Sequence, residues 1–187
     1  SGEAAGLVPT PQWKKENRDE LWYIGDTYHL AIGQGDFLVT PLQIARMTAY
    51  FASGGKWTVP RLVQPSANHQ INESSGPGID PQHIEIVRQG MREAVPYGSA
   101  RALSDLPMQA AGKTGTAQWA TNKSPHAWFT GFAPYTDPQI AVTILIEDGG
   151  EGSVVALPVA KKIMRWWYDN RMPSENLTQK LPVGTVQ

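Results

Sequence analysis

The order of the predicted elements in the second half of the chain most constrains its fold. Three extended segments follow one another, over residues 112–119, 128–134 and 139–147. The last two are joined by residues 135–138, Tyr-Thr-Asp-Pro, a sequence typical of a hairpin turn. A helical segment over residues 155–169 comes next. This order predicts an antiparallel sheet flanked by helices, an α/β fold of the α+β type. The Val- and Ile-rich third segment is expected to be a central strand.

The first half of the chain is predicted to be mainly helical. Thr40-Pro41-Leu42-Gln43 has the pattern of a helix start, with Thr40 as N-cap and Gln43 closing a capping box, and that helix should end at Gly54-Gly55. Asp80-Pro81 predicts a second helix by the same logic. Between them we expect a short strand over residues 56–63 and a surface loop over residues 64–79. Residues 1–30 are expected to be irregular.

Composition narrows the possible functions. The chain has 187 residues, of which 41% are hydrophobic, enough for one globular core. Its net charge of −1 suggests no nucleic-acid or anionic-membrane partner. Because the chain has no cysteine, it has no disulfide, thiol nucleophile or cysteine metal site. The longest apolar run, residues 140–146, is too short to cross a bilayer.

The most specific motif is AAGKTGTAQW, residues 110–119. Lys113 offers a positive charge, Thr114 and Thr116 offer hydroxyls, and Gly115 leaves the backbone unobstructed. These groups suit an anionic ligand, since a hydrogen bond to a charged group contributes about 1.5–3 kcal/mol. A phosphate loop is disfavoured, because position 107 is Pro rather than Gly and an extended segment follows instead of a helix. A strand with a lysine of no special role is the plain alternative.

Longer stretches around this motif resemble a known family. Three stretches stand in the order seen in class B penicillin-binding proteins: IGQGDFLVTPLQIARMTAYFASGGKWTVPRLV, AAGKTGTAQ and HAWFTGFAPYTDPQIAVTILIEDGG. A fourth stretch near the start, GLVPTPQWK, looks most like the elongation-type penicillin-binding protein 2 group of that family. The resemblance implies a membrane-anchored, periplasmic D,D-transpeptidase that cross-links peptidoglycan and is acylated by β-lactams. Residues 1–170 would be the C-terminal part of the transpeptidase domain, which shares its fold with serine β-lactamases, and residues 171–187 a flexible tail. Neither a metal nor another cofactor is implied.

The resemblance also implies roles for the motif. Lys113 and the hydroxyls of Thr114 and Thr116 would bind the terminal carboxylate of a D-Ala-D-Ala stem peptide or of a β-lactam, and Gly115 would let the ligand backbone lie against the strand. The backbone N–H of Thr116 would help to form the oxyanion hole. Lys113 and Thr116 are three residues apart and so fall on opposite faces of a flat strand. Either the strand twists or bulges here, or the ligand straddles its edge.

The nucleophile of the family, the Ser of S-x-x-K, is not expected in this chain. Two segments match the family patterns by their letters alone: Ser53-Gly54-Gly55-Lys56 matches S-x-x-K, and Ser66-Ala67-Asn68 matches S-x-N. However, Ser53 would end a helix rather than begin one, and in relatives the GQG segment follows S-x-N. We therefore expect both true elements before Ser1. The fold would then be incomplete at its N-terminal side, with the N-terminal remainder of the domain as its partner and the membrane anchor also absent. The chain alone is predicted to be inactive.

Alternative functions remain at this point. A serine β-lactamase or β-lactam sensor of the same superfamily is one, and a non-catalytic interaction module is another. His126 is either a general base or a histidine at the rim of a pocket. Glu147, Asp148 and Glu151 form either a cation site or a solvated turn.

Overall fold

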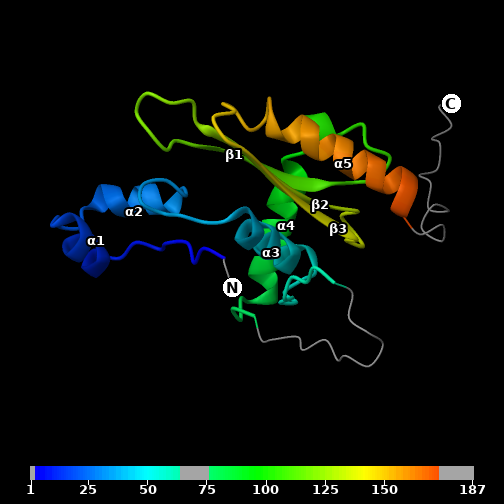
Figure 1. Ribbon diagram of the computed structural model, residues 1–187. Coiled ribbons are helices and arrows are strands. Elements are labelled where there is room, and N and C mark those ends of the chain that lie inside the picture. The colour runs from blue at the N-terminus through cyan, green and yellow to red at the C-terminus, as the bar shows by residue number, and fades with distance from the viewer. Residues whose placement is uncertain (1–2, 64–75, 173–187) are drawn as a thin grey trace.

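The computed structural model describes residues 3–63 and 76–172 (Figure 1). The predicted surface loop, apart from residues 76–79, and the predicted tail from residue 173 lie outside this part. The helices and strands follow in this order: α1 (Pro11–Arg18), α2 (Ile24–Ala31), α3 (Pro41–Ala52), α4 (Pro81–Glu93), a 3-10 turn η1 (Arg101–Leu103), β1 (Ala111–Ala117), β2 (His126–Ala133), β3 (Ile140–Ile146) and α5 (Ala156–Arg171). Among them, no helix is long and apolar enough to cross a membrane.

The three strands form one antiparallel sheet in the order β1-β2-β3. Helix α5 packs on one face and α3 on the other, as the sequence predicts for an α+β fold (Figure 1). The expected position of the third strand is wrong, because β2 is central in this sheet and β3 lies at its edge. Ile140, Ile144 and Ile146 pack against the core on the α5 side. Helices on both faces therefore account for the apolar sequence of β3 without a strand on each side.

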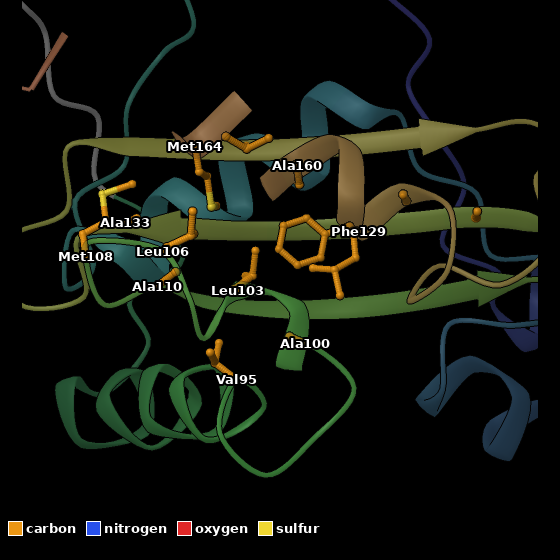
Figure 2. Packing of buried hydrophobic residues seen from close by; sticks show 14 residues of the cluster. Val95, Ala100, Leu103, Leu106, Met108, Ala110, Phe129, Ala133, Ala160 and Met164 are labelled. Carbon is orange, nitrogen blue, oxygen red and sulfur yellow. The ribbon is translucent and has the colours of Figure 1, made fainter. Parts of the chain in front are cut away.

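The main core lies between the sheet and α5. Phe129, Leu103, Leu157 and Met164 are almost completely buried there. Figure 2 shows Phe129 of β2 on the side of the sheet that also holds Ala160 and Leu103. A Cβ added at Gly112 would lie 2.6 Å from the ring of Phe129, so the glycine before Lys113 provides room for this aromatic side chain.

The predicted helix starts at Thr40 and Asp80 are confirmed. The Thr40 hydroxyl accepts a hydrogen bond from the Gln43 backbone N–H, and the Gln43 side chain accepts one from the Thr40 backbone N–H. Asp80 caps α4 by accepting from the backbone N–H of Gln82. Helix α3 ends as predicted, and Gly54 follows it with φ 73°, a conformation that favours glycine.

Two predictions for the N-terminal half are wrong. Residues 56–63 form no strand in the structure. The segment predicted to be irregular, residues 1–30, instead holds α1 and all of α2 except its last residue, Ala31. The start of α1 repeats the signal of the later helices, because the Thr10 hydroxyl accepts from the Trp13 backbone N–H and Pro11 occupies the first turn. The polar run after Pro11 hid this short helix, since it has few apolar residues to show a period.

Helices α1 and α2 stand apart from the sheet (Figure 1). They are joined by Lys14, whose ammonium group donates to both carboxylate oxygens of Asp26 at 2.9 and 2.8 Å. This hydrogen bond is the main cause that lowers the pKa of Asp26 and raises the pKa of Lys14. We call residues 3–39 the N-terminal unit and the rest of the described chain the sheet body.

Candidate functional site

Strand β1 carries the Lys-Thr-Gly-Thr motif along an edge of the described sheet. Each residue from Ala111 to Ala117 pairs with one residue of β2, so the strand has no bulge. Side chains alternate along such a strand, which places Lys113 and Gly115 on the α3 side and Thr114 and Thr116 on the α5 side. Of the alternatives that the sequence leaves open, the bulge is therefore absent. A ligand that straddles the edge of the strand can contact both Lys113 and Thr116.

The backbone groups of the two threonines face outward from this edge. The carbonyl oxygen of Thr116 accepts a hydrogen bond from the side-chain amide of Gln34 at 3.0 Å, and that of Thr114 accepts one from Lys113 Nζ at 2.6 Å. The N–H and C=O of one residue point to the same side of an antiparallel strand. The N–H of Thr116 is therefore directed to the outer edge as well, where an oxyanion donor would have to lie.

Lys113 supplies the positive charge at this edge. Its side chain is exposed, and in residues 3–63 and 76–172 no carboxylate oxygen lies within 4.0 Å of Nζ. An ammonium group without a carboxylate partner attracts an anionic ligand more strongly than one already paired.

The two threonine side chains differ in accessibility. Thr116 is exposed, and its hydroxyl lies 3.4 Å from the backbone N–H of Gly152. Thr114 is 9% exposed, and its hydroxyl is hydrogen bonded to that of Ser99 at 2.6 Å. Ser99 thus holds the Thr114 hydroxyl, which is free to donate its proton to a ligand oxygen when Ser99 is the donor of their shared hydrogen bond, because a hydroxyl can donate once and accept twice.

The loop before α5 packs closely against the backbone of β1. Gly152, in the loop before α5, lies so near that a Cβ there would collide with the backbone oxygens of Gly115 and Trp128. A Cβ at Gly115 would lie 3.2 Å from Trp128 Cβ. Glycine at position 115 therefore relieves crowding inside the sheet, in addition to any role in letting a ligand approach.

A polar aromatic cluster closes the end of the sheet beyond Thr116. The rings of Trp119 and His126 stack with centroids 5.2 Å apart, and Trp119 Nε1 donates to Asp148 Oδ1 at 2.7 Å. His126 Nδ1 accepts from the backbone N–H of Asp148 at 3.1 Å. The structure thus ties His126 and Asp148 to each other and to Trp119. In the described residues, no group of three or more acidic or histidine side chains is placed so that it could hold a metal ion.

Ser53 lies at the end of a helix, as the sequence predicts. It follows the last residue of α3, and its hydroxyl is hydrogen bonded to the backbone of Tyr50 and Lys56. A serine at a helix C-terminus lacks the positive end of the helix dipole that a nucleophile at an N-terminus has. The second imitation motif, residues 66–68, lies outside the described residues.

Sequence reasoning missed two residues that contact the motif. Gln34 is hydrogen bonded to Thr116, which is 82 residues away in the sequence, and Ser99 is hydrogen bonded to Thr114, which is 15 residues away. The sequence signal for Gln34 is the GQG segment, residues 33–35, which belongs to the stretch that resembles the family but did not indicate a contact for its glutamine. Nothing local marks Ser99, because its contact depends on how the chain turns between α4 and β1.

The sequence profile described as the penicillin binding protein transpeptidase domain matches residues 1–165. The chain belongs to this family. It is similar to the peptidoglycan D,D-transpeptidase MrdA of Haemophilus influenzae, with 32% identity over 91% of this chain and 30% of that protein. The chain therefore spans about a third of the length of such curated relatives.

Solved structures of the family share the fold. Penicillin-binding protein 2 of Pseudomonas aeruginosa, solved in complex with WCK 5153, matches with a TM-score of 0.76 and 38% identity over 93% of this chain and 41% of that one. Penicillin-binding protein A of Mycobacterium tuberculosis, solved as a ceftriaxone acyl-enzyme, matches with a TM-score of 0.59 and 30% identity over 73% of this chain and 34% of that one. The expected fold is thereby confirmed.

Proposed function

We propose that this chain is the ligand-binding wall of a peptidoglycan D,D-transpeptidase, and that β1 binds the D-Ala-D-Ala end of a stem peptide as an added strand. The observation that carries the proposal is the outer edge of β1. It presents the Thr116 N–H and C=O outward beside Lys113, whose ammonium group has no carboxylate oxygen within 4.0 Å in the described residues. An extended peptide that ends in a carboxylate matches both features.

Each motif group has one task in this reaction. Lys113 and the hydroxyls of Thr114 and Thr116 hold the terminal carboxylate, and Gly115 keeps the strand backbone accessible. The N–H of Thr116 donates to the carbonyl oxygen of the penultimate D-Ala, where negative charge develops in the tetrahedral intermediate. Because the ligand straddles the strand edge, Lys113 on one face and Thr116 on the other can act on the same molecule.

The chemistry is acyl transfer to a serine and then to an amine. The serine Oγ attacks the carbonyl carbon of the penultimate D-Ala, and its proton passes to the departing nitrogen as the peptide bond breaks and terminal D-Ala leaves. The amine of a neighbouring stem peptide then attacks the ester carbon, forms the cross-link, and returns a proton to the serine oxygen. A β-lactam takes the first step only, since its leaving group stays attached.

We infer that the serine comes from a segment outside residues 1–187, because the position of Ser53 at the end of α3 does not suit a nucleophile. Such a protein would be anchored in the bacterial inner membrane and would act in the periplasm, where peptidoglycan is cross-linked. We call the protein that contains both this chain and the S-x-x-K segment the complete enzyme.

Labelling with fluorescent penicillin tests the proposal. The complete enzyme is expected to form a stable covalent adduct and to release D-Ala from an N-acylated D-Ala-D-Ala peptide. The 187-residue chain alone is expected to form none, as judged by intact mass. An adduct that maps to Ser53 would contradict the assignment of the nucleophile. Rapid hydrolysis of the penicillin by the complete enzyme would favour a β-lactamase instead, and the absence of any adduct a non-catalytic module.

A further inference from the structure

The turn before α3 is built to present Gln34. Gly33 and Gly35 have φ values of 71° and 76°, which are in the left-handed region that favours glycine. The backbone N–H of Gln34 donates to the carbonyl oxygen of His29 at 2.8 Å, which fixes this turn to the end of α2. The backbone of Gln34 is therefore held in place on both sides, and its side chain projects from a constrained position.

The side-chain amide of Gln34 lies on the strand edge that the proposed function assigns to the ligand. Its Nε2 donates to the carbonyl oxygen of Thr116 at 3.0 Å, and this hydrogen bond is exposed to solvent. Within residues 3–63 and 76–172, no other hydrogen bond joins the N-terminal unit to the sheet. An incoming ligand can reach this bond, and its loss would leave the strand itself intact.

A glutamine side chain ends in the same chemical group as a peptide bond. An extended ligand that pairs with β1 would donate one of its own peptide N–H groups to the outward carbonyl of Thr116. We propose that, in the free protein, the side-chain amide of Gln34 donates the hydrogen bond that the ligand N–H would donate. Gln34 then competes with the ligand for the carbonyl oxygen of Thr116. This inference rests on the proposed function, because it needs β1 to be the binding strand.

The competition makes Gln34 a residue that affects specificity. A ligand with an amide N–H must displace Gln34 and then replaces its hydrogen bond with an equivalent one. A ligand without that N–H gains nothing from the displacement and leaves Gln34 where it is. Removing the glutamine amide therefore helps only ligands of the first kind, by roughly two- to tenfold, the range expected for one net neutral hydrogen bond.

The test uses Gln34→Met and Gln34→Ala in the complete enzyme with two β-lactams. Methionine keeps the length of the side chain and removes the donor, whereas alanine removes both. Penicillin G carries an acylamino N–H, and imipenem carries a hydroxyethyl group in its place. We expect both variants to raise the second-order rate of acylation by penicillin G about two- to tenfold, and the rate with imipenem to stay within about twofold of the parent.

Three results would overturn the proposal. Equal changes with both lactams would show that Gln34 acts on the site in general, a fall in the penicillin rate would show that Gln34 assists the ligand, and unchanged rates with both would show that it does not compete. Failure of the proposed function gives a different result, because the parent enzyme would then be acylated by neither compound.

Discussion

The sheet body and the N-terminal unit are held together in different ways. The sheet body buries large apolar side chains such as Phe129, Phe132 and Leu157 at 0–1% exposure. In the N-terminal unit, α2 has no buried residue, and Tyr23, Ile24 and Tyr28 are each more than 60% exposed. The unit relies on the Lys14–Asp26 pair and on helix caps. Hydrophobic burial thus stabilises the sheet body, which carries the motif, whereas polar contacts hold the N-terminal unit, whose Gln34 contacts the edge of β1.

This contrast bears on the proposed function, which uses both regions. The strand edge must keep a fixed geometry to aim the Thr116 N–H, and a packed core provides that rigidity. In the further inference Gln34 must be displaceable. In the described residues one exposed hydrogen bond joins the N-terminal unit to the sheet, and a second, from Gln43 Nε2 to the carbonyl oxygen of Ala5, joins it to α3, so Gln34 can move without disturbing the core. The following predictions test the contrast, from the largest expected effect to the smallest.

Truncation of the core should destabilise the whole molecule. Phe129→Ala removes a ring that is 0% exposed between β2 and α5, and we expect a loss of about 3–5 kcal/mol in the free energy of unfolding. Ile24→Ala in α2, where the side chain is 68% exposed, should change it by less than about 0.5 kcal/mol. Urea unfolding followed by circular dichroism measures both. Similar effects at the two positions would contradict the division into a packed body and a polar unit.

Removal of a threonine N-cap should lower the stability of the whole fold in the sheet body but only that of one helix in the N-terminal unit. Thr40→Ala removes the N-cap of α3, which packs on the sheet, and should lower global stability by about 1 kcal/mol. Thr10→Ala removes the equivalent cap of α1 and should speed amide hydrogen exchange only in residues 11–18. Hydrogen exchange measured by mass spectrometry separates a local opening from a global one. If Thr10→Ala also speeds exchange in β2, the two regions unfold together.

The N-terminal unit should loosen first in acid. Hydrogen bonding to Lys14 lowers the pKa of Asp26 below its ordinary value of 3.8, so its ionised form stabilises the fold. That contribution is complete above pH 3.8 and is lost as the pH falls through the lower pKa of the folded state. Hydrogen exchange in residues 11–31 should therefore rise below this pH before exchange in the sheet. Asp26→Asn should abolish this difference in pH dependence, and an unchanged pH profile in that variant would contradict it.

The same contrast explains how much the sequence could predict. Strands and helices of the sheet body show periodic apolar residues or clear caps, so β1 to β3, α3, α4 and α5 are all found close to their predicted positions. Helix α1 was missed because the unit around it buries little apolar surface. Local sequence also placed the charge and the hydroxyls of the motif on one strand. It could not show that Ser99 and Gln34 contact them, since those contacts depend on tertiary packing.

The central claim is that the outward N–H of Thr116 on β1 acts on the ligand. Thr116→Pro removes this N–H at an outward position of an edge strand, a place where proline is tolerated. Thr116→Val removes the hydroxyl but keeps the N–H and serves as the matched control, and melting temperatures establish that both variants fold.

The decisive measurement is the second-order rate of penicillin G acylation of the complete enzyme. The account predicts that Thr116→Pro lowers this rate by a factor of about 10²–10³, as expected for loss of one oxyanion donor, and that Thr116→Val lowers it much less. If folded Thr116→Pro is acylated at the rate of Thr116→Val, the outward N–H of β1 does not stabilise the reaction and the central claim is wrong.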